Sequence, residues 1–448
     1  MEIELSVTRQ VVGILCGLAL ATGAAGASDQ AASVQYAWVQ HGGPSGAVVR
    51  AISTSKTCPQ LNHDGEVSKM HLRMDAPPHG FEGIYVCEAG IAQTAQGLSI
   101  GPVALPPPAK VLDRVAVIGD TGCRVNYGEV QNCTGDGNGP AWDYQGIADA
   151  AAKSKPDVVI HVGDMHYREH TSACGQSCKH ENIGFNWHSW EADFFHPSKT
   201  LMQAAPWIMV RGNHEDCGRA WRGWFYFLDP NPMSRSTWPL DCPAASEGEK
   251  SWFYTDPYSL EFDGVRVIVM DSSYIADDYH TPDPATVAQY ASEFGMVEDM
   301  AGQDAKPSWL VTHRPFWAVA SWGTSNAGPT DATLQAALAA STQGKLPDNV
   351  KVTLAGHIHL MQSLSFADGR PQQMVFGNSG TKRDPGLADN GQLHANVVRA
   401  LARLGVAQTG FAWSETFDFG LITPDANGWT AAVKAKDGST IASFPIQK

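Results

Sequence analysis

Five short apolar runs, rich in β-branched residues, follow one another along the second part of the chain. They are VAVIG (115–119), VVIHVG (158–163), WIMVRG (207–212), WLVTH (309–313) and VTLAG (352–356). Continuous apolar runs of this length are typical of strands that are buried on both faces of a sheet. The segments between them are long enough for crossovers, and in one of these Tyr144, Ile147, Ala148 and Ala151 share a helical face. The pattern predicts an α/β sheet that is covered by helices.

Other segments alternate between apolar and polar residues in the manner of half-buried strands. Four such runs before residue 91 are separated by Gly, Pro, Asn and Asp, and the stiff sequence PPPAK (106–110) follows them. Hairpin-like runs at 251–271 and beyond 363 indicate a mixed sheet. We therefore expect a mixed-sheet α/β (α+β) sandwich with helices outside over residues 109–448, preceded by a small all-β, sandwich-like domain over residues 28–108.

The first 27 residues have the features of a signal peptide. Residues 11–27 are apolar and then small, and Ala25-Gly26-Ala27 before Ser28 fits an A-x-A cleavage site. An uncleaved anchor is the alternative, but the apolar run is shorter than the about 20 residues that a spanning helix needs. We expect residues 1–27 to be removed and the protein to be exported, to a periplasm or out of the cell, without a membrane span.

The cysteines support an oxidising compartment. Cys16 lies in the predicted signal peptide, and the even number that remains is typical of disulfides in an exported protein. A metal site at CGQSC (174–178) is the alternative for one pair, but no partner C-x-x-C accompanies it. Pairing of sequence neighbours predicts the disulfides Cys58–Cys87, Cys123–Cys133, Cys174–Cys178 and Cys217–Cys242.

The charge of the chain argues against one class of partner. Its formal net charge is −15, and 43% of its residues are hydrophobic. An acidic surface repels phosphate backbones, so long nucleic acid is not an expected partner. The apolar content is sufficient for a sizeable core.

Each of the five apolar runs ends in polar residues that can bind a metal ion. Because ligands in open α/β sheets bind at the carboxyl ends of strands, we expect these residues to converge on one crevice. In four of the five motifs a glycine directly precedes the first of these polar residues, which lets the backbone turn sharply. The spacing of the last two histidines is compatible with one shared ion or with one ion each. The residues are Asp120, Asp164, Tyr167, Asn213, His214, His313, His357 and His359.

This ordered set of motifs, GDTG, GDMHY, GNHE, VTHRP and GHIH, resembles that of the calcineurin-like metallophosphoesterases. The tyrosine three residues after Asp164 resembles the purple acid phosphatase branch. The resemblance covers about residues 114–378 and implies a metallophosphoesterase-like fold with two metal ions. It implies that the first ion is held by Asp120, Tyr167 and His359, that the second is held by Asn213, His313 and His357, and that Asp164 bridges both.

The donor types favour particular metals. Oxygen and imidazole donors without thiolate suit iron, manganese or zinc. A tyrosine phenol has a pKa of about 10, so its binding as phenolate requires a strongly acidic ion. We expect Fe(III) at the Tyr167 site and Fe(II), Zn(II) or Mn(II) at the second site.

The expected activity is that of an exported, acid phosphatase-like hydrolase. It would hydrolyse small phosphomonoesters by attack of a metal-bound hydroxide. His214 is placed to contact the phosphate or to protonate the leaving group, and Arg314 to clamp the phosphate, unless either residue is only structural. The alternatives are a phosphodiesterase or nucleotide hydrolase on the same core, and a phosphate- or metal-binding protein without catalysis. The oligomeric state is left open.

Overall fold

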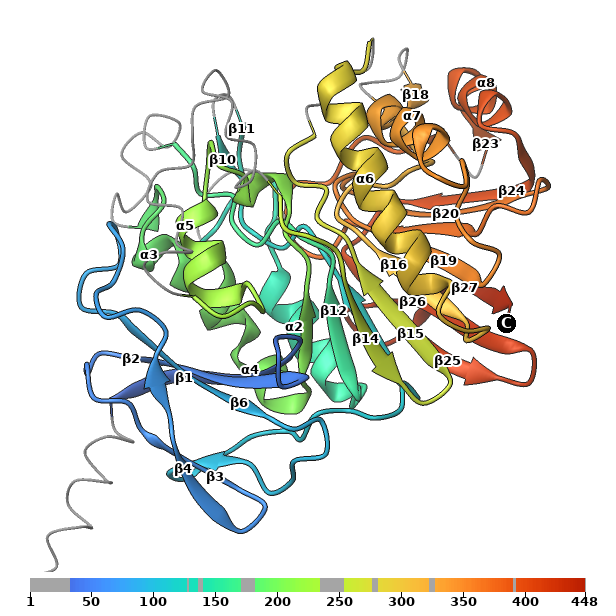
Figure 1. Ribbon diagram of the computed structural model, residues 1–448. Coiled ribbons are helices and arrows are strands. Elements are labelled where there is room, and N and C mark those ends of the chain that lie inside the picture. Colours follow the sequence, from blue (N-terminus) through green and yellow to red (C-terminus); the bar gives the residue numbers. More distant parts are fainter. Residues whose placement is uncertain are drawn as a thin grey trace, which may run out of the picture.

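The computed structural model describes residues 33–126, 129–135, 140–170, 182–233, 254–275, 281–321, 327–389 and 392–447. The predicted signal peptide and the pair Cys174–Cys178 lie outside the described residues. Two large sheets form the centre of the molecule, and helices cover their outer faces (Figure 1). No helix in the described part of the chain has the length and apolar character of a membrane-spanning segment.

The first sheet has ten strands, and three of the predicted apolar runs lie in its middle. These are β9 (Val115–Ile118), β12 (Val158–His161) and β13 (Trp207–Met209), which are parallel to one another. Antiparallel strands continue the sheet beyond β9 in the order β25 (Asp418–Asp425), β26 (Gly428–Ala435) and β27 (Thr440–Gln447). Beyond β13 the sheet continues through β1 (Val34–His41), β2 (Ala47–Ser53), β6 (Tyr85–Ile91) and β5 (His71–Leu72).

The second sheet has seven strands and contains the other two apolar runs, β16 (Ser308–Val311) and β19 (Val350–Ala355). These two pair in parallel with each other. The flanking strands include antiparallel partners, so the predicted mixed sheet is confirmed. They are β14 (Tyr258–Phe262), β15 (Val265–Val269), β20 (Met361–Phe366), β21 (Gln372–Phe376) and β24 (Val406–Trp413).

Alternation of side chains explains why the central strands are apolar throughout. In β9, Val115 and Val117 pack between the two sheets, whereas Ala116 and Ile118 pack under helices on the other face. Helices on that side include α2 (Tyr144–Lys153), which begins at the tyrosine of the predicted helical face, and α4 (His196–Ala204). Over the second sheet lie α6 (Pro284–Ala301), α7 (Ala332–Ala340) and α8 (Ala395–Arg403) (Figure 1). The expected α/β sandwich with helices outside is confirmed.

The N-terminal region is strand-rich, as expected, and it is hydrogen-bonded to the rest of the molecule. Strand β1 pairs in parallel with β13 at Gln40 and Trp207, so β1, β2, β6 and β5 extend the ten-stranded sheet. A separate small sheet consists of β4 (Glu66–Lys69), β3 (Gln60–His63), β7 (Ser99–Ile100) and β8 (Val103–Ala104). The division of the chain into domains at residue 108 stays a prediction.

Two of the predicted disulfides are confirmed, and neither joins the regions before and after residue 108. Cys58 is bonded to Cys87, and Cys123 is bonded to Cys133. Cys217 is also disulfide-bonded. Its predicted partner Cys242 lies outside the described residues.

A buried ionic network fastens the N-terminal strands to the segment after β13. The guanidinium groups of Arg50 and Arg73 share the carboxylate of Glu88, at 3.1 and 2.6 Å. Both arginines also donate to the backbone carbonyl of Asp229, and Arg50 donates to that of Phe227 at 2.7 Å. A buried charge is costly without partners, so the arginines must stay in contact with these carbonyls. The network therefore holds the segment of Phe227 and Asp229 against the N-terminal strands.

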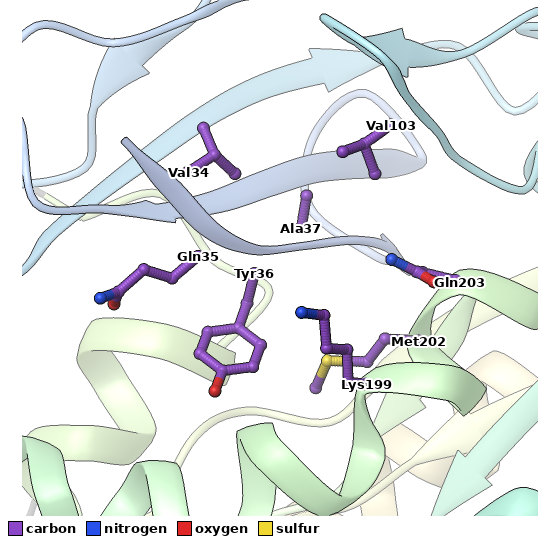
Figure 2. A pocket seen from close by; sticks show the side chains of 8 residues that line it. All are labelled: Val34, Gln35, Tyr36, Ala37, Val103, Lys199, Met202 and Gln203. Atoms are coloured by element: carbon purple, nitrogen blue, oxygen red, sulfur yellow. The ribbon is translucent and has the colours of Figure 1, made fainter. Parts of the chain in front are cut away.

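A small cavity lies where the first residues of β1 face α4 (Figure 2). Its volume is about 140 Å³, and Tyr36 and Lys199 are among its lining residues. The Tyr36 hydroxyl donates to Glu191 at 2.9 Å. The lining contains no cluster of candidate catalytic residues, so this cavity is a gap in the packing between the two layers.

Candidate metal centre

The structure brings all seven predicted ligands together at the carboxyl ends of the parallel strands. The segments after β9, β12 and β13 supply ligands from the first sheet, and those after β16 and β19 supply ligands from the second. All seven side chains are linked by short contacts within one cluster. The crevice therefore lies where the edges of both sheets meet, as the strand-end positions predict.

The first group of donors surrounds the hydroxyl of Tyr167. This oxygen lies 2.6 Å from Oδ2 of Asp164, 3.1 Å from Oδ1 of Asp120 and 2.9 Å from Nε2 of His359. All four residues are buried. Four potential ligands thus face one point, although they come from three separate segments.

The second group of donors surrounds the amide oxygen of Asn213, in the short helix η5 (Asn213–Glu215). Oδ1 of Asn213 lies 2.9 Å from Nε2 of His313 and 2.8 Å from Nδ1 of His357. Nε2 of His313 is also 3.2 Å from Oδ2 of Asp164. Asp164, His313 and His357 each offer a ligand atom within 4.8 Å of the others. Asp164 therefore takes part in both groups.

Hydrogen bonds outside the cluster orient two of its histidines. Nδ1 of His313 lies 2.8 Å from the carbonyl oxygen of Val162, which only accepts, so Nδ1 carries the proton and Nε2 faces the cluster with its lone pair. The carboxylate of Asp384 accepts the backbone N–H of His359 at 3.0 Å and lies 3.6 Å from its Nδ1. Such partners fix the ring orientation of metal-binding histidines.

The backbone at three of the candidate ligands is in a left-handed conformation. The φ angles are 53° at Asp120, 59° at Asp164 and 72° at His357. Residues other than glycine rarely adopt such angles, and each costs of the order of 1–3 kcal/mol. This concentration of backbone strain in one cluster is typical of functional sites.

Two of the glycines before the candidate ligands provide space for other side chains of the cluster. A Cβ atom on Gly212 would lie 2.0 Å from Oδ1 of Asp164, and one on Gly356 would lie 2.4 Å from Oδ2 of Asp120. Neither glycine has a positive φ angle, so the missing side chain is what matters at both positions. Each glycine makes room for a ligand that comes from another segment.

The pKa shifts of the acidic donors indicate that this cluster suits a cation. Burial raises the pKa of Asp120 well above its usual range, and the neighbouring charge of Asp164 adds to the shift. Burial, Asp164 and Asp120 likewise raise the pKa of the Tyr167 hydroxyl. Burial opposes ionisation of Asp164 too, but His313 and His214 hold the pKa of that carboxyl well below its usual range. A bound cation would relieve the repulsion among these oxygens, so the residues present suit metal ions.

His214 lies beside the first group and is held on two sides. Its backbone N–H donates to Oδ1 of Asp164 at 2.8 Å, and its Nδ1 lies 2.6 Å from Oε1 of the buried Glu169. The imidazole packs against the ring of Tyr167 with 3.9 Å between centroids. Its Nε2 is 3.9 Å from Oδ2 of Asp164, so that nitrogen is directed toward the cluster.

Arg314 lies beside the second group. Its Nη1 is 2.8 Å from Nε2 of His357 and 3.7 Å from Oδ1 of Asp331. The side chain is buried, and its backbone N–H donates to the hydroxyl of Ser272 at 2.8 Å. Both predicted catalytic residues are thus within contact of predicted ligands, one beside each group.

Two buried carboxylates hold the segment that carries Asp164 and Tyr167. Glu215 accepts the backbone N–H groups of Gly212, Asp164, Met165 and His166. Asp193, in the π-helix η4 (Glu191–Phe195), accepts those of Cys123, Tyr167 and Arg168. Both carboxylates are fully buried.

Four residues that support the cluster escaped the sequence analysis. Glu215 completes the motif GNHE, and its position after Asn213 and His214 was the available signal. Glu169 follows Tyr167 by two residues, and Asp384 lies 25 residues after His359; neither belongs to a strand-end motif. Asp193 gave no signal, since it is an ordinary acidic residue of a helical segment.

Comparisons with known proteins concern the family and the fold of the chain. A family model described as calcineurin-like phosphoesterase matches residues 113–361, which is more than half of the chain. A purple acid phosphatase from seeds of yellow lupin (Lupinus luteus) is 13% identical, with a TM-score of 0.56, over 93% of this chain and 74% of that chain. The structure of PhoD is 13% identical, with a TM-score of 0.53, over 92% of both chains. These two likenesses concern the fold alone. No curated protein sequence matches the chain.

The contact between Asp384 and His359 provides a test of the centre. Because Asp384 orients His359 from behind, Asp384→Asn is expected to weaken metal binding by about 10- to 100-fold. Competition with a chelator, followed by elemental analysis, measures this change. Asp437→Asn, at an exposed carboxylate far along the chain, serves as the control. Equal metal affinity in the two variants would contradict the role of Asp384.

Proposed function

The chain belongs to the calcineurin-like phosphoesterase family, and on this premise we propose that it hydrolyses phosphomonoesters at a centre of two metal ions. Hydrolysis of small phosphate esters follows from the family. The choice of monoesters, the acid phosphatase-like character and the two-ion mechanism are our proposal. The observation that carries it is the pair of donor groups that share Asp164.

The two groups divide the ligands between the ions. We assign Asp120, Tyr167 and His359 to the first ion, and we assign Asp164 to both. Asn213, through its amide oxygen, and His313 and His357, through imidazole nitrogens, would hold the second ion. Seven donors are too many for one ion and suit two ions that keep positions open.

The types of donor support an assignment of the metals. The phenol of Tyr167 has a raised pKa because of burial and of Asp164 and Asp120, so its ionisation requires a strongly acidic cation. Fe(III) meets this requirement in the first position. The second group, with one amide and two imidazoles, suits Fe(II), Zn(II) or Mn(II). Bound metal ions supply polarisation of the phosphoryl group and activation of water at this site.

Residues of the chain supply the remaining steps. Since a carboxylate only accepts, Glu169 fixes the proton of His214 on Nδ1 and directs Nε2 toward the cluster. A protonated His214 then donates from Nε2 to the oxygen of the leaving group. The guanidinium of Arg314 lies beside the second donor group, where it binds a phosphoryl oxygen and holds the ester in position.

We also propose that the protein is exported, to a periplasm or out of the cell. The disulfides Cys58–Cys87 and Cys123–Cys133 support an oxidising compartment, and the A-x-A pattern before Ser28 supports cleavage of a signal peptide. Residues 109–448 would form the catalytic unit, and the strands of residues 28–108 would support it from one edge of the sheet.

Turnover of model esters tests the proposed reaction. The metal-loaded protein is expected to hydrolyse 4-nitrophenyl phosphate faster than bis(4-nitrophenyl) phosphate, and a chelator is expected to stop both reactions. Asp164→Asn should lower turnover by more than about 100-fold because both donor groups lose a shared ligand. His188→Ala, at an exposed histidine, is the control. Faster diester hydrolysis would indicate a phosphodiesterase, and binding without turnover would indicate a non-catalytic protein.

The visible spectrum tests the assignment of Fe(III). Protein loaded with iron is expected to absorb visible light through the Tyr167 phenolate, and Tyr167→Phe is expected to lose this band while the fold is kept. Tyr36→Phe, at a tyrosine that contacts Glu191 far from the cluster, should keep it. A band that persists in Tyr167→Phe would rule the assignment out.

Leaving-group dependence tests the role of His214. His214→Ala is expected to lower kcat about 10²- to 10⁴-fold for esters of poorly acidic alcohols, and less for 4-nitrophenyl phosphate, whose leaving group needs little protonation. Arg314→Ala should instead raise KM for all esters. If the rates of His214→Ala fall equally for every leaving group, His214 is not the proton donor.

A further inference from the structure

Three charged side chains form a small cluster beside the first donor group, and the proposed chemistry does not use them. Arg124 immediately precedes the hairpin of β10 (Val125–Asn126) and β11 (Glu129–Val130). Its Nε lies 2.6 Å from Oε2 of Glu129, and Nζ of Lys382 lies 2.7 Å from the other oxygen of that carboxylate. We name Arg124, Glu129 and Lys382 the rim cluster.

The rim cluster is close to the centre and open to solvent. The guanidinium carbon of Arg124 lies 5.7 Å from the centroid of the Tyr167 ring. Lys382 follows Thr381, whose backbone N–H donates to the carbonyl of Asp120 at 2.8 Å. The Arg124 side chain is 22% exposed, and those of Glu129 and Lys382 are 38% exposed. A molecule bound at the centre therefore reaches these side chains from the solvent side.

The rim cluster has more positive than negative charge. One carboxylate, that of Glu129, serves two cations, so one positive charge is not compensated within the cluster. Asp384, the nearby carboxylate on the segment that follows Lys382, is directed to the backbone and ring of His359 instead. In a chain with a net charge of −15, an excess of positive charge beside the centre distinguishes this place from the average surface.

We propose that Arg124 and Lys382 bind a second anionic group of the substrate, a carboxylate or a phosphate that belongs to the leaving group. The proposal rests on the proposed function and names its substrate class, phosphomonoesters of acidic leaving groups. Glu129 holds both cations in place, so that their donors need little ordering when the anion binds. Guanidinium and ammonium groups on one rim suit planar and tetrahedral anions alike.

Binding of non-hydrolysable analogues tests this inference without relying on turnover. Metal-loaded protein is titrated calorimetrically with phenylphosphonate and with 4-carboxyphenylphosphonate, and the ratio of the two Kd values measures the contribution of the second anion. Arg124→Gln and Lys382→Gln are each expected to reduce this ratio by about tenfold. A second arm uses ethylphosphonate and 1,2-ethylenebisphosphonate, which contain only C–P bonds and are not hydrolysed, and the arm with the larger ratio identifies the preferred anion.

Two further variants sharpen the test. Glu129→Gln keeps an amide oxygen that can position the cations but removes the shared counter-charge, and it is expected to raise the ratio by about three- to fivefold. Lys153→Gln removes an exposed cation at the end of α2 and is expected to leave the ratio unchanged. Because the variants of Glu129 and Arg124 change the ratio in opposite directions, loss of folding does not imitate the expected result.

The outcomes separate this inference from the proposed function. The inference is overturned if 4-carboxyphenylphosphonate and the bisphosphonate bind no better than their matched partners, or if the variants weaken both members of each pair equally. The rim cluster then only connects the hairpin to residues 380–384. If the ratios change as expected but the protein hydrolyses no ester, the second-anion site stands and the proposed function fails.

Discussion

Oxygen atoms of three acidic side chains lie close together in one small buried space, and their mutual repulsion on ionisation is the constraint on which the architecture around the site depends. The carboxylates of Asp120 and Asp164 both approach the hydroxyl of Tyr167, within 3.1 and 2.6 Å. In a medium of low polarisability, two such carboxylates do not both ionise unless positive charge lies between them. Burial and Asp164 accordingly raise the pKa of Asp120. An arrangement that is unfavourable as a protein core is suitable for binding cations.

The fold keeps these groups in place by fixing the backbone that carries them. Glu215 accepts four backbone N–H groups, and Asp193 accepts three more from the segments of the first donor group. These carboxylates are themselves buried, and burial together with Asp164 raises the pKa of Glu215 well above its usual range. Convergent N–H groups provide the compensation that a buried carboxyl needs. Acidic side chains thus surround the centre in two layers, and backbone N–H donors stabilise the outer layer.

The sequence indicated the candidate ligands, which the structure brings together, because their positions follow from a local pattern. Each ligand segment follows a buried apolar strand, and glycine precedes Asp120, Asp164, Asn213 and His357, so periodicity and turn chemistry both indicate the strand ends. The resemblance to a known family then divided the ligands between two ions. The spacing of His357 and His359 alone left that division open.

The supporting residues were harder to predict because they act across the fold. Asp193 reaches Tyr167 from a π-helix of the outer layer, and no local pattern marks a helical aspartate that points inward. The pairing of β1 with β13 likewise depends on which edge of a sheet is available, which the alternation within β1 does not encode. The proline-rich stretch 106–110 indicated a spacer between two regions. The pairing of β1 with β13 nevertheless joins these two regions in one sheet.

The position of Asp164 links the chemistry of the centre to the packing of the two sheets. Its Oδ2 faces Tyr167 from the first group and His313 from the second, whereas its Oδ1 is occupied by the backbone N–H of His214. Asp164 follows a strand of the ten-stranded sheet, and His313 follows a strand of the seven-stranded sheet. A change in charge at one donor group therefore alters the electrostatic environment of the other through Oδ2 of Asp164, across the interface between the sheets. The left-handed backbone at Asp164 is part of this arrangement, in which Oδ2 faces both groups while Oδ1 accepts from His214.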